Sequence, residues 1–193
     1  GLAASRNMRV HRWDFVSAYL QGSLEAGEVV YCHPPPGYER VDDDGHRLCC
    51  KVVKPIYGMA QAGRRWQGTL FPWLKQFGFT ACDHDACVFR MSRPASDGTE
   101  ESLILGVYVD DLAVAFSRDG PGSLYSDFVS ALRAKFEVED EGELSDLLGI
   151  DFSVSGGVVS LTQTKYIERL VATFLRDGVP PDFQRNKLPY VKA

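Results

Sequence analysis

The sequence predicts an α+β fold in which helices cover one face of a mainly antiparallel sheet. Short apolar segments without a helical period are joined by tight-turn sequences such as Ser155-Gly156-Gly157, which is typical of β-hairpins. Longer segments between them place apolar residues three to four positions apart, which is typical of amphipathic helices. Hairpins interspersed with helices indicate an α+β domain, because a sheet must bury its apolar face against another layer.

The amino-terminal part of the chain is predicted to hold short strands and turns. Three prolines between His33 and Glu39 allow neither a helix nor a ladder, so this stretch is a turn. In chain order we expect a helix tail over residues 1–7 ending at Asn7, a strand over Met8–Phe15, a short helix over Ser17–Leu20 ending at Gly22, a strand over Val29–Cys32, and a hairpin with its tip at Asp42–Gly45 between Tyr38–Val41 and Arg47–Val53.

Helical spacing defines the longer elements that follow. A helix over Gly63–Phe77 is predicted by a stripe of apolar residues at helical spacing, Trp66, Leu70, Leu74 and Phe77. Gly78 is its natural stop, and Pro72 within it predicts a kink. The other expected elements are strands over Val88–Met91, Leu103–Val109 and Leu112–Phe116, a polar loop over Ser92–Ser102, a helix over Leu124–Phe136, a hairpin of Gly149–Val154 with Val158–Leu161, a helix over Thr164–Leu175 capped by Thr164, and an irregular tail after Gly178.

The composition bounds the class of protein. With 193 residues, 45% of them hydrophobic, we expect a single domain over residues 1–193. The net charge of −5 counts against strong autonomous binding to nucleic acid, but it excludes neither a carboxylate site nor a basic patch at Arg64-Arg65. Five cysteines at irregular spacing form no disulfide framework and indicate a reducing interior. No apolar run approaches a membrane span, so we expect no membrane partner.

Two adjacent carboxylates, Asp110 and Asp111, interrupt the most apolar segment of the chain, Leu103–Phe116. Burying an unpaired carboxylate is costly, so we expect a hairpin with both acids at its tip, where they can meet a cation. A hard divalent cation needs further oxygen ligands, and Asp14 at a strand end is the best candidate, although it also fits as a helix N-cap. The acidic tip Asp42–Asp44 is interpreted as a solvated turn.

Several blocks of the sequence match one family in its order. Tyr108-Val109-Asp110-Asp111 resembles the YxDD box of reverse transcriptases. The blocks WDFVSAYLQGSLEAGEVVYCHPPPGYE, LCCKVVKPIYGMAQAGRRW, GFTACDHDACVF, LSDLLGIDF and LTQTKYIERLVATF resemble successive segments of copia-type LTR retrotransposon polymerases and cover nearly the whole chain. Five ordered blocks are far more specific than the four-letter box alone.

The resemblance implies a polymerase palm with the start of a thumb at the carboxyl end. It implies that Asp14, Asp110 and Asp111 hold two Mg²⁺ ions, with Mn²⁺ as an alternative, and that the backbone carbonyl of Phe15 faces a metal. Asp110 is the stronger candidate ligand and Asp111 the weaker. The activity implied is two-metal transfer of dNTPs to a primer 3′-OH on an RNA or DNA template. The chain starts without Met, just before the first catalytic Asp, so we expect an N-terminally truncated piece that lacks most of the fingers.

The resemblance also assigns a nucleotide and primer site. Tyr19 would exclude a ribose 2′-OH, Tyr57, Gly58 and Gln61 would lie against the incoming nucleotide and template, and Tyr108 would contact the primer end. Alternatively, Tyr19 is a core tyrosine and Tyr108 an ordinary strand residue. Two departures from the family pattern are Gly63 in place of Pro and Ala60 in place of Lys.

Other interpretations compete with these. A zinc site at Cys82, His84 and Cys87 lacks a fourth ligand and is disfavoured. Arg64-Arg65 either contacts a phosphate backbone or forms a solvated helix face. The alternative functions are a catalytically inactive retroelement remnant with weak nucleic-acid binding, or a different two-metal palm enzyme such as a nucleotide cyclase. The family context implies the rest of a Pol polyprotein (RNase H and integrase) as partners and a cytoplasmic, virus-like-particle location.

Overall fold

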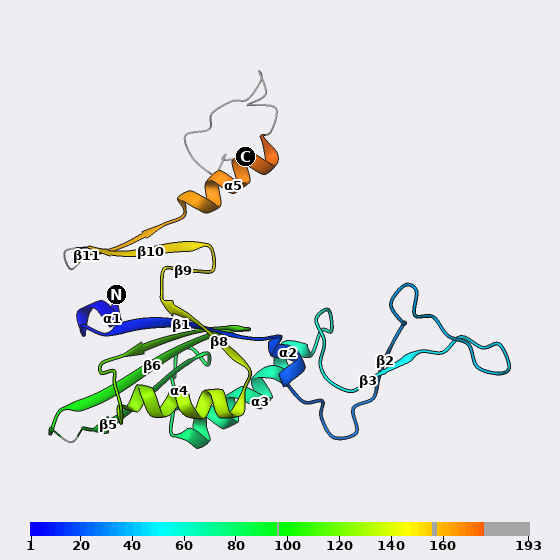
Figure 1. Ribbon diagram of the computed structural model, residues 1–193, viewed down its shortest axis with the longest axis horizontal. Helices are drawn as coiled ribbons and strands as arrows, with labels where there is room; N and C mark the ends of the chain where they lie inside the picture. Colours follow the sequence, from blue (N-terminus) through cyan, green and yellow to red (C-terminus); the bar gives the residue numbers. More distant parts are fainter. Residues whose placement is uncertain (96, 156–157, 176–193) are drawn as a thin grey trace. The chain divides into compact units, whose positions relative to one another are not determined.

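A computed structural model describes residues 1–95, 97–155 and 158–175. Its contacts divide the chain into two compact units, Gly1–Leu144 and a second unit that begins at Ser145. The first unit contains α1 (Leu2–Ser5), β1 (Arg9–Phe15), α2 (Ala18–Gln21), β2 (Val30–Cys32), β3 (Cys50–Val52), α3 (Ala62–Phe77), β4 (Thr80–Ala81), β5 (Val88–Pro94), β6 (Glu100–Tyr108), β7 (Asp111–Phe116), α4 (Leu124–Lys135) and β8 (Val138–Glu143) (Figure 1).

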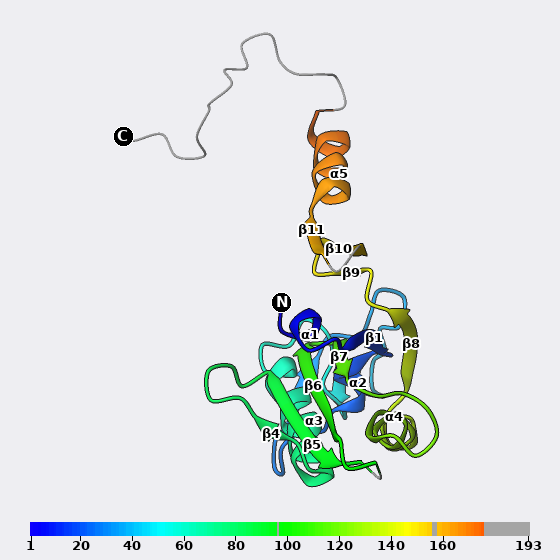
Figure 2. The ribbon, with the colours of Figure 1, turned by 90° about the vertical axis from the view of Figure 1, so that its left-hand side faces the viewer.

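The main sheet has six strands in the order β4-β5-β6-β7-β1-β8 (Figure 2). Every neighbouring pair in it is antiparallel, which confirms the predicted sheet type. The sequence did not predict β8, because its residues Val138–Glu143 include four acids and a single apolar side chain. This strand nevertheless pairs with β1 through a register shift between Arg12 and Trp13, so β1 lies inside the sheet.

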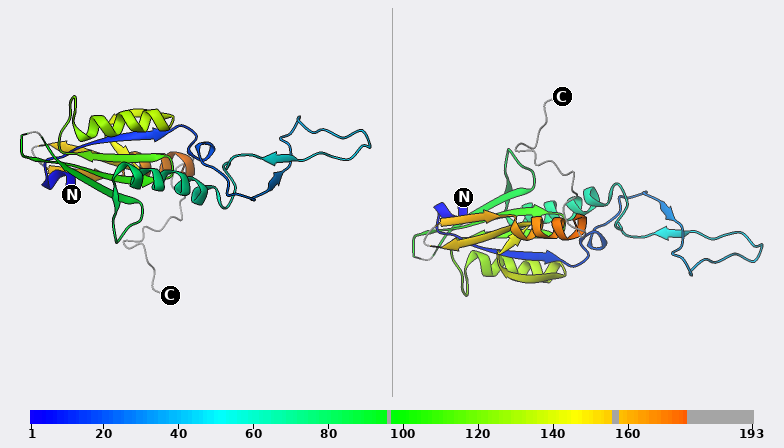
Figure 3. Two further views of the ribbon diagram at one scale, coloured as in Figure 1. Left: turned by 90° about the horizontal axis from the view of Figure 1, so that it is seen from below. Right: turned by 90° about the horizontal axis from the view of Figure 1, so that it is seen from above.

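Helices α3 and α4 pack against one face of this sheet (Figure 3, left; α3 in teal, α4 in yellow-green). Alternate strand residues such as Trp13, Phe15 and Leu112 point to that face and are almost completely buried. On α3 the predicted stripe of Trp66, Leu70 and Leu74 is fully covered by the core, as is the matching face of α4. The prediction that helices cover one face of the sheet is confirmed.

Helix α3 continues through Pro72 as one helix and ends at Gly78, whose φ of +125° favours glycine. The predicted loop Ser92–Ser102 is wrong at both ends, because β5 and β6 extend into it. Their extension is stabilised by Glu101, a buried carboxylate that accepts a hydrogen bond from the backbone N–H of Leu124 at 2.6 Å.

The predicted hairpin around residues 42–45 forms only in part. A single bridge joins Val41 to Arg47, and β3 pairs with β2 instead. In the second unit, β9 (Asp146–Leu147) and β11 (Val158–Thr162) flank β10 (Ile150–Ser155), and α5 (Thr164–Phe174) follows. The β10–β11 hairpin was predicted.

The predicted cap of α5 is wrong. Gln163 occupies the N-cap position and makes no side-chain cap hydrogen bond, so Thr164 is the first helical residue rather than the cap. The predicted irregular tail after Gly178 lies outside the described residues.

Candidate active site

The register of three strands brings the predicted carboxylates together. Asp111 at the start of β7 lies directly opposite Asp14 on β1, and Tyr108 at the end of β6 lies opposite Asp111. Residues paired across strands share a face of the sheet. The neighbours of Asp14 on β1, Trp13 and Phe15, point into the core, so these three polar side chains lie on the face that α3 and α4 leave uncovered.

The predicted hairpin forms between β6 and β7, but its tip is a two-residue turn of Val109 and Asp110. The expectation that both acids lie at the tip is wrong for Asp111, because it pairs with Tyr108 as the first residue of β7. Val109 has a φ of +56°, which is rare for a β-branched residue and costs about 1–3 kcal/mol. Both turn carbonyls accept hydrogen bonds: Val109 from the indole Nε1 of Trp66 at 2.6 Å, and Asp110 from the backbone N–H of Phe15 at 2.8 Å. The turn is therefore held by α3 and β1 together.

The three acids repel one another. Burial raises the pKa of Asp14, and the charges of Asp110 and Asp111 raise that pKa further. Glu141 on β8 adds to this effect, while Arg12 opposes it. A raised pKa means that the ionised form is disfavoured in the folded protein, and a bound cation would relieve the repulsion.

Arg12 is a site residue that sequence reasoning missed. Its Nε and NH2 atoms lie 2.9 and 2.8 Å from the same Asp111 oxygen, and both side chains are largely buried. Arg12 precedes Asp14 by two positions, so strand alternation alone places it on the same face. Arg12 would therefore compete with a metal ion for the Asp111 carboxylate. The stronger metal role assigned to Asp110 stays a prediction.

The donor set fits a hard divalent cation, because it consists of carboxylate oxygens. Among the described residues, the one group of side chains whose ligand atoms all lie within 4.8 Å of one another is instead Asp42, Asp44 and His46. The carboxylates of Asp14, Asp110 and Asp111 are thus more widely spaced than those side chains, and their mutual repulsion favours such a separation. Cys82, His84 and Cys87 do not form such a group.

Two tyrosines link the carboxylates to α3. The rings of Tyr19 on α2 and Tyr57 lie 4.5 Å apart between centroids. Burial and the nearby charge of Asp110 raise the pKa of Tyr57, which also hydrogen-bonds that carboxylate. A side chain added at Gly63 would lie 3.7 Å from the Tyr19 hydroxyl, so Tyr19 reaches the first turn of α3. The tyrosines predicted for the nucleotide site therefore lie beside the acids.

The other predicted nucleotide residues are differently placed. Gly58 has a φ of +93°, and an added Cβ would meet open space. Glycine is therefore favoured there by backbone conformation, and the contact of Gly58 with the incoming nucleotide stays a prediction. Tyr108 is exposed at the end of β6, next to Asp111. The Gln61 amide donates a hydrogen bond to Glu28 at 3.0 Å, a partner that no sequence pattern indicated.

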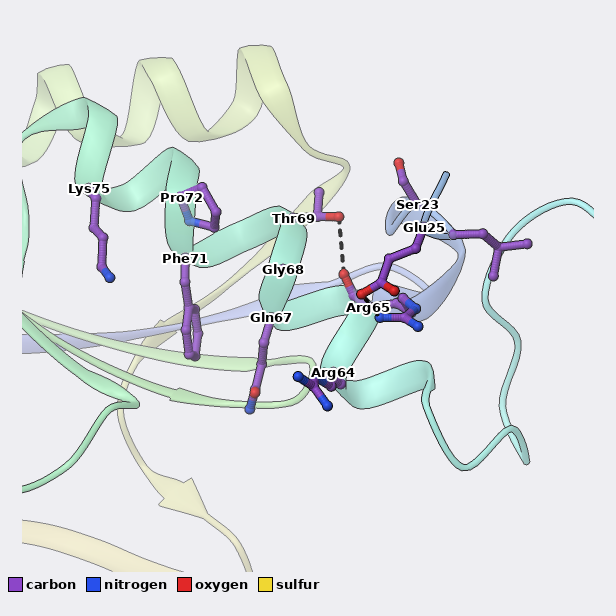
Figure 4. Close-up of a pocket in the computed structure, with 11 residues that line it drawn as sticks. Ser23, Glu25, Arg64, Arg65, Gln67, Gly68, Thr69, Phe71, Pro72 and Lys75 are labelled. Carbon is purple, nitrogen blue, oxygen red and sulfur yellow. Dashed lines mark hydrogen bonds and ion pairs between the residues drawn. The ribbon is translucent and has the colours of Figure 1, made fainter. Parts of the chain in front are cut away.

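The side chain of Phe15 is completely buried against Trp66 and Phe136. Its backbone carbonyl stays a predicted metal contact. The two arginines Arg64 and Arg65 lie in different environments. Arg64 is exposed beside a groove along α3 (Figure 4). Arg65 forms ion pairs with Glu25 and Glu28. Arg65 is therefore held by acidic side chains of the chain itself, and a contact of this arginine pair with a phosphate backbone stays a prediction. No described helix is long and apolar enough to cross a membrane.

The geometry defines a class of protein: a mixed α/β fold with a mostly antiparallel sheet and three carboxylates at adjoining strand ends. Residues 1–179 match the family described as "Reverse transcriptase (RNA-dependent DNA polymerase)". The chain therefore belongs to the reverse transcriptase family, and the nucleotide cyclase alternative is wrong. No solved structure matches it.

The curated relatives are polyproteins of transposons. The chain is 31% identical over 89% of its length to the "Retrovirus-related Pol polyprotein from transposon RE1" of Arabidopsis thaliana. It is 30% identical over 93% of its length to that from transposon TNT 1-94 of Nicotiana tabacum, and 24% identical to the "Transposon Ty1-DR4 Gag-Pol polyprotein" of Saccharomyces cerevisiae, again over 93%. The chain spans 11%, 13% and 10% of these relatives. The predicted copia-type resemblance is confirmed.

Proposed function

We propose that the chain forms the palm and the start of the thumb of an RNA-directed DNA polymerase of a copia-type retrotransposon. The observation that carries this proposal is the register that sets Asp14 opposite Asp111, with Asp110 in the adjoining turn. A polymerase needs carboxylates held rigidly at one point of a sheet, and hydrogen bonds from two elements hold this turn.

In this proposal Asp14, Asp110 and Asp111 hold two divalent cations, Mg²⁺ or Mn²⁺. When bound, such a pair activates the primer 3′-OH and stabilises the leaving pyrophosphate. Arg12 orients the Asp111 carboxylate through its two hydrogen bonds. The raised pKa of Asp14 supports a site that gains from added positive charge.

The remaining residues have proposed binding roles. Tyr19 is the sugar-selecting ring, and its contact with Tyr57 supports a fixed ring position. Tyr57, Gly58 and Gln61 lie along the incoming nucleotide and template. Tyr108 contacts the primer end, and the backbone carbonyl of Phe15 faces a metal ion. The partners are a primed RNA or DNA template, dNTPs and the RNase H and integrase parts of a Pol polyprotein, in a cytoplasmic virus-like particle.

A second candidate function is that of an inactive remnant with weak nucleic-acid binding. The net charge of −5 favours it, as does the engagement of Arg65 in ion pairs within the chain. This alternative predicts no primer extension under any metal condition.

Primer extension on a primed RNA template tests the proposal. The protein carries these 193 residues together with any residues that precede them in their reading frame, and dNTPs and rNTPs are supplied separately with Mg²⁺. We expect metal-dependent incorporation of dNTPs, and Tyr19→Val is expected to admit rNTPs with a loss of selectivity of tenfold or more, on the order of 1.4 kcal/mol. Extension that persists without divalent metal, or is absent with it, contradicts the proposal.

A further inference from the structure

Glu28 connects two side chains on the first turn of α3 from outside that helix. Its Oε1 accepts a hydrogen bond from the Gln61 amide at 3.0 Å, and its Oε2 accepts one from Arg65 Nε at 2.7 Å. The Glu25 backbone N–H also donates to Oε2 at 3.0 Å. Glu28 and Arg65 side chains are each only 14% exposed. The carboxylate is thus engaged through both oxygens.

This arrangement fixes the orientation of Gln61. An ionised carboxylate only accepts hydrogen bonds, so the Gln61 atom facing it must be the amide nitrogen. Three hydrogen bonds lower the pKa of Glu28 to about 2, so the carboxylate stays ionised across the working pH range. Gln61 also begins α3, since its carbonyl accepts the Arg65 N–H at 3.0 Å. Both the side chain and the backbone of Gln61 are therefore held.

The start of α3 is connected to the candidate active site by direct contacts. Tyr19 approaches Gly63 in the first turn, Tyr19 contacts Tyr57, and Tyr57 interacts with Asp110. None of these contacts involves Glu28 itself. A change at Glu28 would thus reach the site only through Gln61 and the helix start.

We propose that Glu28 is a positioning residue for the incoming nucleotide, because it holds the Gln61 amide in the orientation that the nucleotide meets. This inference rests on the proposed polymerase function and names a residue to which the family resemblance assigned no role. Because Glu28 contacts Gln61 and Arg65 rather than the site carboxylates, its loss should raise the KM for dNTPs while kcat changes little.

Glu25 provides a matched control. It also pairs with Arg65, but its side chain is 67% exposed, and the Gln61 amide hydrogen-bonds to Glu28 rather than to Glu25 (Figure 4 shows Glu25 beside Arg65). Glu28→Ala and Glu25→Ala each remove one acidic partner of Arg65, and Glu28→Ala alone removes the partner of Gln61. A difference between them therefore reports on Gln61.

The test measures KM and kcat for dNTPs in primer extension by the wild-type protein, Glu28→Ala, Glu25→Ala, Gln61→Ala and the Glu28→Ala/Gln61→Ala double variant, with the melting temperature of each. We expect Glu28→Ala to raise KM roughly tenfold with kcat within about twofold, and Glu25→Ala to leave both unchanged. The double variant should resemble Gln61→Ala, because the two residues act as a unit.

Three results would overturn the inference while leaving the proposed function intact. The first two are equal effects of Glu28→Ala and Glu25→Ala on KM, and additive effects of Glu28→Ala and Gln61→Ala on KM. A fall in melting temperature with unchanged KM would likewise show a purely structural role. Absence of extension by the wild-type protein would instead refute the proposed function, and the inference would fall with it.

Discussion

The first unit contains two acidic clusters that are built in opposite ways. Asp14, Asp110 and Asp111 are spread over two strands and a turn, and the core beneath them holds the turn through Trp66. Asp42, Asp44 and His46 lie within five residues at an exposed tip, with ligand atoms closer together. The difference teaches that close spacing alone is a poor sign of a functional site.

The hydrogen bonds of the tip explain its compactness. One oxygen of Asp42 accepts the backbone N–H groups of Asp44 and His46, at 3.1 and 2.8 Å. These bonds are what an acidic turn uses to close on itself. In the strand cluster, by contrast, burial and mutual charge raise the pKa of Asp14. A bound cation would relieve the repulsion among these acids, which supports the proposed metal site.

The largest effect on stability should come from removing Trp66, whose indole holds the turn beside Asp110 and Asp111. Trp66 is 1% exposed and packs against Phe15 and Phe136. Trp66→Ala should lower the free energy of unfolding by about 3–5 kcal/mol and abolish the hydrogen bond to the turn. Val41→Ala, at the exposed tip, should change it by no more than about 0.5 kcal/mol. Urea unfolding measures both, and equal effects would contradict the comparison.

A smaller effect is expected from the ion pair of Arg12 with Asp111. Arg12→Met should cost about 1–3 kcal/mol without metal, because it leaves a largely buried carboxylate unpaired beside two others. Added Mg²⁺ should restore part of this loss. Arg9→Met is the control on the same strand, since Arg9 pairs with Asp119 in an exposed position and should cost less than about 1 kcal/mol. Thermal unfolding with and without Mg²⁺ measures both losses. A larger loss for Arg9→Met than for Arg12→Met would contradict this prediction.

The smallest effect concerns pH. The folded-state pKa of Asp14 lies above its ordinary value of 3.8, so its contribution favours folding at low pH and is lost as pH rises through the raised pKa. In metal-free solution Asp14→Asn should therefore be more stable than the wild-type protein at pH 7. The gain should shrink as pH falls toward 3.8. Unfolding curves at several pH values test this, and a gain that grows in acid would refute it.

Local patterns in the sequence predicted most helices and strands. The stripe of Trp66, Leu70 and Leu74 specified α3 because burial follows helical spacing. Strand β8 escaped prediction because its acidic residues lack the apolar alternation of a half-buried strand. It forms through pairing with β1, a partner more than a hundred residues away in the sequence.

The site was predictable as a set of residues and not as a geometry. The apolar arms around Asp110 and Asp111 correctly indicated a hairpin, but its turn is Val109-Asp110, and Asp111 is the first residue of β7. The pairing of Asp14 with Asp111 depends on strand order, which local propensity does not encode. The contacts of Glu28 with Gln61 and Arg65 likewise arise from tertiary packing, so no local pattern revealed them.

The most direct test of the central claim compares one residue from each acidic cluster in Mg²⁺-dependent primer extension. Asp110→Asn keeps the shape of the side chain but removes a ligand charge, and we predict that it lowers kcat by on the order of 10³-fold or more. Asp44→Asn makes the same chemical change at the exposed tip and should leave kcat within about twofold. An Asp110→Asn protein that extends primers at the wild-type rate would contradict the account.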